Sequence, residues 1–137
     1  MLLKIRGGII IVNQITKNNL SHFMNSYHYL HDSYIKDINY KLEQDEIDVL
    51  IYVFWSFEPV LKDNNFIETN KTKLKMVFKG IKEYKEDNRF SDYIDEAIIK
   101  YGKTNNREYI QFASDEMEAV FYVVCDKIDY EEIKCSW

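Results

Sequence analysis

Two histidines and one aspartate stand close enough together in the sequence to form a reactive site. His28 lies three residues before His31 and four before Asp32, so on a helix the three side chains would be neighbours. Two imidazoles and a carboxylate can hold zinc or iron and leave coordination positions open for a substrate. The pattern therefore allows a metal site, as part of a small-ligand-binding or metal-dependent enzyme.

A structural role for the same residues is the more frequent explanation. At the C-terminal end of a helix, His31 would gain from the carbonyl dipole, and Asp32 is a residue type that favours turns. A structural zinc site usually has four ligands, and no cysteine or further histidine follows in the neighbouring sequence. We therefore predict no catalytic residue and no cofactor, and keep His28, His31 and Asp32 as metal-ligand candidates.

Other patterns that would indicate an enzyme are missing from the sequence. Gly7-Gly8 begins neither of the glycine-rich loops that bind phosphate, and no serine has the glycine neighbours of a nucleophile elbow. Acidic residues such as Asp48, Glu116 and Glu118 are frequent, but spacing alone does not identify a catalytic pair of carboxylates. The sequence therefore favours a non-enzymatic protein.

The two candidate histidines would be positioned by a helix near the N-terminus. Thr16 can cap this helix, and apolar residues then recur every three or four positions. These apolar residues are Leu20, Phe23, Met24, Tyr27 and Leu30. We expect the helix to end near His31-Asp32, where the period of the apolar residues changes.

After Tyr34, apolar and polar residues alternate as they do in half-buried strands. The expected strands cover residues 35–42, 47–55, 73–81, 98–101, 108–112 and 117–125, and residues 128–133 could extend the last strand or return from it. The sequence thus predicts one α+β domain over residues 1–137. Its sheet should be mostly antiparallel, could be curved, and should pack against the N-terminal helix.

The segments between these strands carry further expectations. Glu58-Pro59 should break the second strand, because proline lacks a ladder donor, and residues 60–70 should form a polar connection. Gly80 could mark a bulge, and residues 90–97 could form a short helix or an irregular segment. The aromatic residues around the second strand could line a ligand pocket, although core packing is the more frequent explanation. They are Tyr52, Phe54, Trp55 and Phe57.

Residues 1–11 have two interpretations that the sequence leaves open. Residues 9–12 are apolar enough to form a genuine first strand. Alternatively, Arg6-Gly7-Gly8 could be the translation of a purine-rich ribosome-binding sequence, with Val12 as the true start of the protein. The intact mass of the natively expressed protein would decide between the two.

Composition limits the classes of partner. The formal net charge is −5, which disfavours nucleic-acid binding and would suit a basic protein partner. The 11 tyrosines suit interfaces, because their rings bury apolar area and keep a hydroxyl. No segment approaches the roughly 18 consecutive apolar residues of a membrane span, and Cys125 and Cys135 do not form a disulfide framework. We expect a cytoplasmic protein with no membrane partner.

Two short motifs carry a family resemblance. The first is Leu30-His31-Asp32-Ser33 followed by Ile35 and Ile38, and the second is Phe78-Lys79-Gly80-Ile81 on a later strand. This order resembles a loose group of small uncharacterised bacterial proteins, some of which resemble immunity proteins of bacterial toxin systems. The resemblance covers roughly residues 20–85, about half of the chain. It implies a non-enzymatic role and carries no site residues.

The sequence therefore leads to one function and one alternative. The leading expectation is a bacterial protein-binding domain that could neutralise a toxin, with a basic toxin domain as the partner. The alternative is the small-ligand-binding or metal-dependent enzyme that would use His28, His31 and Asp32. A homodimer through an exposed strand edge or through the last strand is a further possibility.

Overall fold

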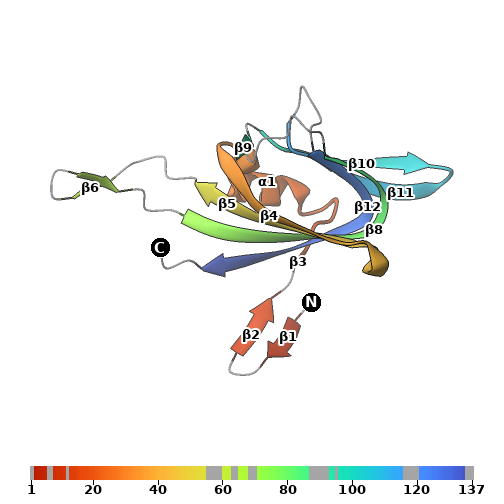
Figure 1. Ribbon diagram of the computed structural model, residues 1–137, viewed down its shortest axis with the longest axis horizontal. Helices are drawn as coiled ribbons and strands as arrows, with labels where there is room; N and C mark the ends of the chain where they lie inside the picture. The colour runs from red at the N-terminus through yellow and green to blue at the C-terminus, as the bar shows by residue number, and fades with distance from the viewer. Residues whose placement is uncertain are drawn as a thin grey trace.

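The computed structural model (Figure 1) describes residues 2–5, 8–11, 13–54, 60–62, 65–67, 71–86, 93–94, 96–115 and 121–134. Its main sheet contains, in spatial order, β10 (Ile98–Thr104), β11 (Arg107–Ala113), β12 (Phe121–Lys134), β8 (Lys71–Glu86), β5 (Glu46–Phe54), β4 (Ser33–Lys41) and β9 (Tyr93–Ile94), and β3 (Asn13–Gln14) also pairs with β12. All of these pairings are antiparallel. The prediction of a mostly antiparallel sheet is confirmed.

One face of this sheet builds the core, because alternate side chains of each strand point to the same side. On β5 the buried side chains are Ile47, Val49, Ile51 and Val53, and on β8 they are Leu74, Met76 and Phe78. Phe78 of β8 also lies 5.4 Å from Phe112 of β11, measured between ring centroids. The predicted alternation on these two central strands is therefore confirmed.

β8 and β12 are strongly curved (Figure 1), and Gly80 lies on β8 close to a shift in the register of this strand pair. Gly80 has a φ of +72°, which favours glycine, and a Cβ there would meet the side chain of Asp126. The pairing register shifts between Val124 and Cys125, close to the bulge that Gly80 was expected to mark. β5 begins opposite Lys79, and Asp45, the residue before β5, accepts hydrogen bonds from the N–H groups of Gly80 and Ile81, each at 3.0 Å.

The helix is shorter than its apolar spacing predicts. Helix α1 spans Leu20–Ser26, and a 3₁₀ turn, η1, follows at His28–Leu30. All three residues of η1 have a positive φ, between 52° and 57°, so the chain leaves the right-handed helix before His28. The carbonyl of Tyr29 accepts a hydrogen bond from the N–H of Ala97 at 3.0 Å, which helps to hold this turn.

The start of the helix also differs from the expectation. Asn19 rather than Thr16 occupies the N-cap position, and the side chain of Asn19 accepts a hydrogen bond from the N–H of Thr16 at 2.7 Å. Side chains of this segment contact the last strand. The ring of Phe23 lies 4.7 Å from that of Tyr130, and the hydroxyl of Tyr27 donates to Glu132 at 2.8 Å.

Several connecting segments differ from their predicted form. In place of a polar connection over residues 60–70, β6 (Val60–Lys62) and β7 (Asn65–Ile67) form a separate hairpin. The two-residue strand β9 lies in the segment that was expected to be a helix or irregular. Residues 128–133 extend β12 without a break. Glu58-Pro59 and residues 116–120, where the last predicted strand was to begin, lie outside the described residues.

At the N-terminus, β1 (Leu2–Ile5) and β2 (Gly8–Ile11) pair with each other and, among the described residues, with no other strand. This hairpin leaves both interpretations of residues 1–11 open, because the start of translation is a property of the gene. Among the described residues, no helix has the length and apolar character needed to cross a bilayer.

Candidate functional site

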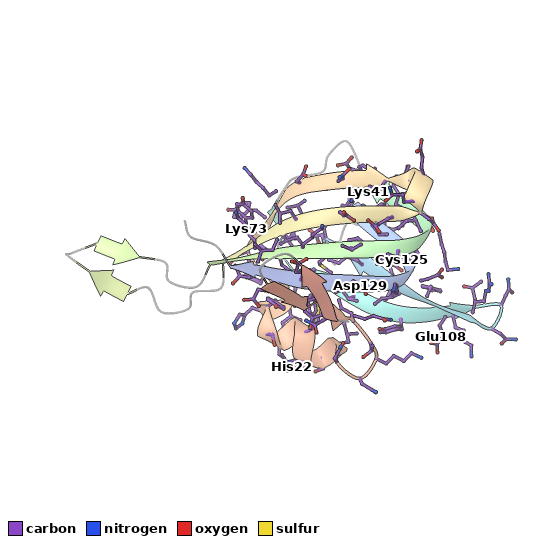
Figure 2. All side chains as sticks on the ribbon, turned by 90° about the horizontal axis from the view of Figure 1, so that it is seen from below. His22, Lys41, Lys73, Glu108, Cys125 and Asp129 are labelled. Atoms are coloured by element: carbon purple, nitrogen blue, oxygen red, sulfur yellow. The ribbon has the colours of Figure 1, made fainter. Side chains whose placement is uncertain are left out.

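The solvent side of β4, β5, β8 and β12 carries the richest set of charged and half-buried side chains, and we call it the outer face. It consists of the residues that alternate with the buried core positions. They include Asp37, Asn39, Lys41, Glu46, Asp48, Leu50, Tyr52, Lys73, Lys75, Val77, Lys79, Lys127, Asp129, Glu131 and Ile133. Figure 2 labels Lys41, Lys73 and Asp129 on β4, β8 and β12.

Two carboxylates are buried at the centre of the outer face. Val77 of β8 pairs with Asp48 on the β5 side and with Asp129 on the β12 side. Only 8% of Asp48 and 5% of Asp129 is exposed, which is rare for aspartate unless it is paired with a cation. The register of three strands therefore fixes two anionic groups on either side of one valine.

Lysines from neighbouring strands pair with these carboxylates. The ammonium of Lys41 lies 2.8 Å from Asp48 and 3.7 Å from Glu46, and Lys75 lies 3.9 Å from Asp48. On the other side, Lys79 approaches Asp129 to 3.1 Å and Lys127 to 3.8 Å.

These lysine side chains are 35–43% exposed, whereas the side chains of Asp48 and Asp129 are 10% and 7% exposed. Long lysine stems can cover apolar and polar surface while the charged end stays in water. Around Asp48 and Asp129, the outer face thus presents ammonium groups to solvent and keeps the two carboxylates beneath them.

The carboxylates of Glu46 and Asp48 lie close together on this face of the sheet. Burial, together with the neighbouring Asp48 carboxylate, raises the pKa of Glu46 above its ordinary value, and the charge of Lys41 opposes this shift. The charged form of Glu46 is therefore less favourable in the folded protein than in water.

Tyr52 provides the aromatic part of the outer face. Lys36 and Lys73 lie over its ring, with their ammonium nitrogens 5.9 Å and 5.5 Å from the ring centroid. Core packing, the explanation favoured from sequence, does not apply to this half-buried ring. The side chain of Phe54, and Trp55 and Phe57 entirely, lie outside the described residues.

The three metal-ligand candidates lie at the turn between α1 and β4. Because η1 is left-handed, His28 and His31 are not on one face of an α-helix. His31 and Asp32 form an ion pair of 2.9 Å at the surface. In the part of the chain that the structure describes, no three His, Cys, Asp or Glu side chains are grouped as metal ligands would be.

Two shallow depressions border the β10–β11 hairpin, and Tyr109 lines both of them. Their volumes are about 430 and 410 Å³. The first is lined by charged and polar residues, including Lys82, Glu83 and Arg107. The second includes Lys17 and Glu108, which form an ion pair at its surface. Neither depression is lined by any of the three metal-ligand candidates.

Cys125 is a buried core residue, and its thiol should react slowly. Its side chain is buried, as the sequence predicts, and burial raises the pKa of its thiol to about 12. The thiolate is the reactive form of cysteine, so this shift suppresses its chemistry near neutral pH. Cys135 lies outside the described residues.

Comparisons of this chain with protein-family models, with curated proteins and with solved structures found no match. The family resemblance therefore stays a prediction. In the structure, Leu30 and Ser33 of its first motif are both buried at the corner that leads into β4, and Phe78 and Gly80 of its second motif lie in the core and at the bend of β8. Both motifs thus occupy positions with a structural role.

Sequence reasoning missed that Asp48 and Asp129 lie on either side of Val77, each as the strand partner of this valine. Each aspartate follows the alternation of its own strand, so each would be taken for an ordinary solvated residue. No signal in the sequence singles them out, because Glu46 precedes Asp48 on β5 and Glu131 follows Asp129 on β12. Only the register of three strands, which periodicity does not give, brings the two together.

Proposed function

We propose that this protein is a non-enzymatic protein-binding domain and that the outer face is its contact surface. The observation that carries the proposal is the layer of lysines anchored over the buried carboxylates of Asp48 and Asp129. Side chains that are already held in place lose less conformational entropy when a partner binds. A pre-ordered, charged surface with half-buried Leu50, Tyr52 and Val77 suits a protein interface better than a bare solvated strand face.

The charge of this surface indicates which side chains the partner would present to it. Because the exposed groups around Asp48 and Asp129 are ammoniums and these two carboxylates lie beneath them, this part of the outer face suits acidic side chains on the partner. The net charge of −5 still favours a partner that is basic as a whole, since long-range steering depends on the total charge. Both conditions fit a basic toxin domain that presents acidic residues at its contact site.

The more specific form of the proposal is an immunity-type protein that neutralises a toxin in the bacterial cytoplasm. It rests on the family resemblance at Leu30–Ser33 and Phe78–Ile81 and on the charge argument. In this proposal, helix α1 backs the opposite side of the sheet and leaves the outer face free. A gene for a large secreted toxin next to this gene would support it.

The experiment is affinity capture from native lysate with a matched pair of variants. The test variant carries Lys75→Met and Lys127→Met, which remove two ammoniums but keep the stems. Asp48 and Asp129 keep their closer partners, Lys41 at 2.8 Å and Lys79 at 3.1 Å. The control carries Lys100→Met and Lys103→Met, the same change of charge on the exposed part of β10.

We expect the wild type and the control to capture the same protein with equal affinity. The test variant should bind it about tenfold more weakly or worse, because each lost interfacial charge pair costs on the order of 1 kcal/mol or more. Equal binding by both variants would show that the outer face is not the contact surface. A wild type that captures nothing would contradict the proposed function itself.

A further inference from the structure

The C-terminal end of β8 forms a second surface, separate from the outer face. β5 pairs with β8 only through Lys71–Lys79, and Asp45 covers the next two N–H groups. From Glu83 to Glu86, β8 pairs with β12 on one side. On its other side, no strand of the described chain pairs with it. With respect to the described residues, this end of β8 is therefore a free strand edge.

The side chains along this edge form a self-complementary series. All five are exposed, and in order they are Lys82, Glu83, Tyr84, Lys85 and Glu86. If a second copy of the edge is laid antiparallel with Tyr84 at the centre, Lys82 faces Glu86 and Glu83 faces Lys85. Every charged residue then meets its opposite, and Tyr84 meets its own copy, which is 42% exposed in the monomer.

We propose that this edge, Lys82–Glu86, pairs with the same edge of a second copy of the chain. The result is a two-fold symmetric dimer in which the two main sheets join into one. A two-fold interface requires a self-complementary patch, and antiparallel pairing about Tyr84 satisfies this requirement for both backbone and charge. Lysines usually protect a free edge from pairing, but here each lysine has a glutamate at the symmetric position.

The partners that these side chains have within the monomer do not prevent the pairing. Tyr84 packs against Tyr40 of β4, with ring centroids 5.5 Å apart, and Glu86 lies beside the hydroxyl of Tyr40. These are side-chain contacts and use no backbone group of the β8 edge. Lys82 lies 3.2 Å from Asp126, whose side chain is 60% exposed, and Glu83 accepts a hydrogen bond from Tyr122 at the surface. Exposed pairs of this kind contribute little stability and exchange readily. Because five residues bury little area, we expect a weak dimer, with a dissociation constant on the order of 0.1 mM.

Two charge variants test the proposal by sedimentation equilibrium. The acidic variant carries Lys82→Glu and Lys85→Glu, and the basic variant carries Glu83→Lys and Glu86→Lys. Each should repel itself and stay at the monomer mass of 16.5 kDa, whereas an equal mixture of the two should dimerise. The wild type should move toward twice that mass at about ten times the dissociation constant.

A control variant with Lys100→Glu and Lys103→Glu changes the charge of β10, which is an outer edge of the sheet. It should associate like the wild type. The proposal is overturned if this control alone stays monomeric, if the mixture fails to associate, or if the wild type stays at 16.5 kDa throughout.

A second measurement needs no variant and so does not depend on how the variants fold. Amide NMR shifts of the wild type should change with protein concentration at residues 82–86, and changes confined to other residues would contradict the proposal. The Lys75→Met/Lys127→Met variant should dimerise normally. The experiments therefore distinguish a failure of the proposed dimer at the β8 edge from a failure of the proposed partner binding at the outer face.

Discussion

Asp48 and Asp129 lie on opposite sides of Val77, and each pairs with this residue across a different strand boundary. The two carboxylates are buried, while the lysines that pair with them remain in contact with water. This relationship turns a half-buried strand face into an ordered layer of positive charge. It is the basis of the proposed contact surface and has consequences that can be measured.

Replacing Asp129 with Asn should destabilise the protein by about 1 kcal/mol. The loss stays below the 3–5 kcal/mol of a fully buried pair, because Lys79 and Lys127 are 36% and 43% exposed and can turn to water. Urea unfolding measures the change. Asp126→Asn on the same strand, where the side chain is 60% exposed, should cost less than about 0.5 kcal/mol. Equal losses at the two positions would contradict the proposed role of Asp129.

Replacing Glu46 with Gln should raise the stability of the protein at pH 7. Burial and the nearby Asp48 carboxylate raise the pKa of Glu46, so its charged form costs free energy in the folded state above that pKa. Below the ordinary value of 4.5 the group is neutral in both states, and the gain should vanish. Unfolding midpoints measured from pH 3 to 7 would show this trend. A gain that grows as the pH falls would contradict it.

Replacing Gly80 with Ala should destabilise the protein by about 2 kcal/mol. The cost has two parts, a φ of +72° and the contact of the new Cβ with the Asp126 side chain. An Asp126→Ala background relieves the contacts with the carboxylate but keeps the contact with the Cβ at 2.8 Å, so we expect more than half of the cost to remain. Thermal unfolding of the four proteins measures the part of the cost that is due to the carboxylate. No loss in either background would mean that β8 does not bend at this glycine.

The thiol of Cys125 should be unreactive in the folded protein. In a Cys135→Ser variant, a thiol reagent should label no cysteine at pH 8 and one in denaturant, because the pKa of Cys125 is raised to about 12. Since that pKa is higher folded than unfolded, its contribution to stability is complete below pH 9 and is lost between pH 9 and 12. Fast native labelling would contradict the burial of this residue.

The metal alternative has a direct test of its own. Elemental analysis of the purified wild type should find no stoichiometric zinc or iron, since a left-handed turn over His28–Leu30 separates His28 from His31 and His31 is paired with Asp32. The variant with all three candidates changed to Ala should match the wild type. Near-stoichiometric metal that disappears in the triple variant would establish the enzyme alternative instead.

The central strands could be predicted from sequence because burial imposes a period of two. Ile47, Val49 and Ile51 alternate with polar or half-buried residues, and no tertiary information is needed to recognise such a strand. The end of the helix could not be predicted in this way. Leu30 fits a helical period, but it reaches the core through a left-handed turn that the hydrogen bond from Ala97 to Tyr29 helps to hold.

Of the candidate site, only the presence of a charged, solvent-exposed strand face could be predicted from the sequence. The alternation of lysine and apolar residues on β8 predicts a wet strand face, and the structure has one. Which residues meet on that face depends on pairing between β5, β8 and β12, which are separated along the chain. For the same reason, the edge at Lys82–Glu86 can be recognised only once β5 is known to begin opposite Lys79.

The most direct test of the account is the affinity of the captured partner for the Lys75→Met/Lys127→Met variant, measured beside the Lys100→Met/Lys103→Met control. The account predicts that binding falls about tenfold or more for the first variant and is unchanged for the second. If the two variants bind the partner equally well, the outer face of β4, β5, β8 and β12 is not where this protein meets its partner.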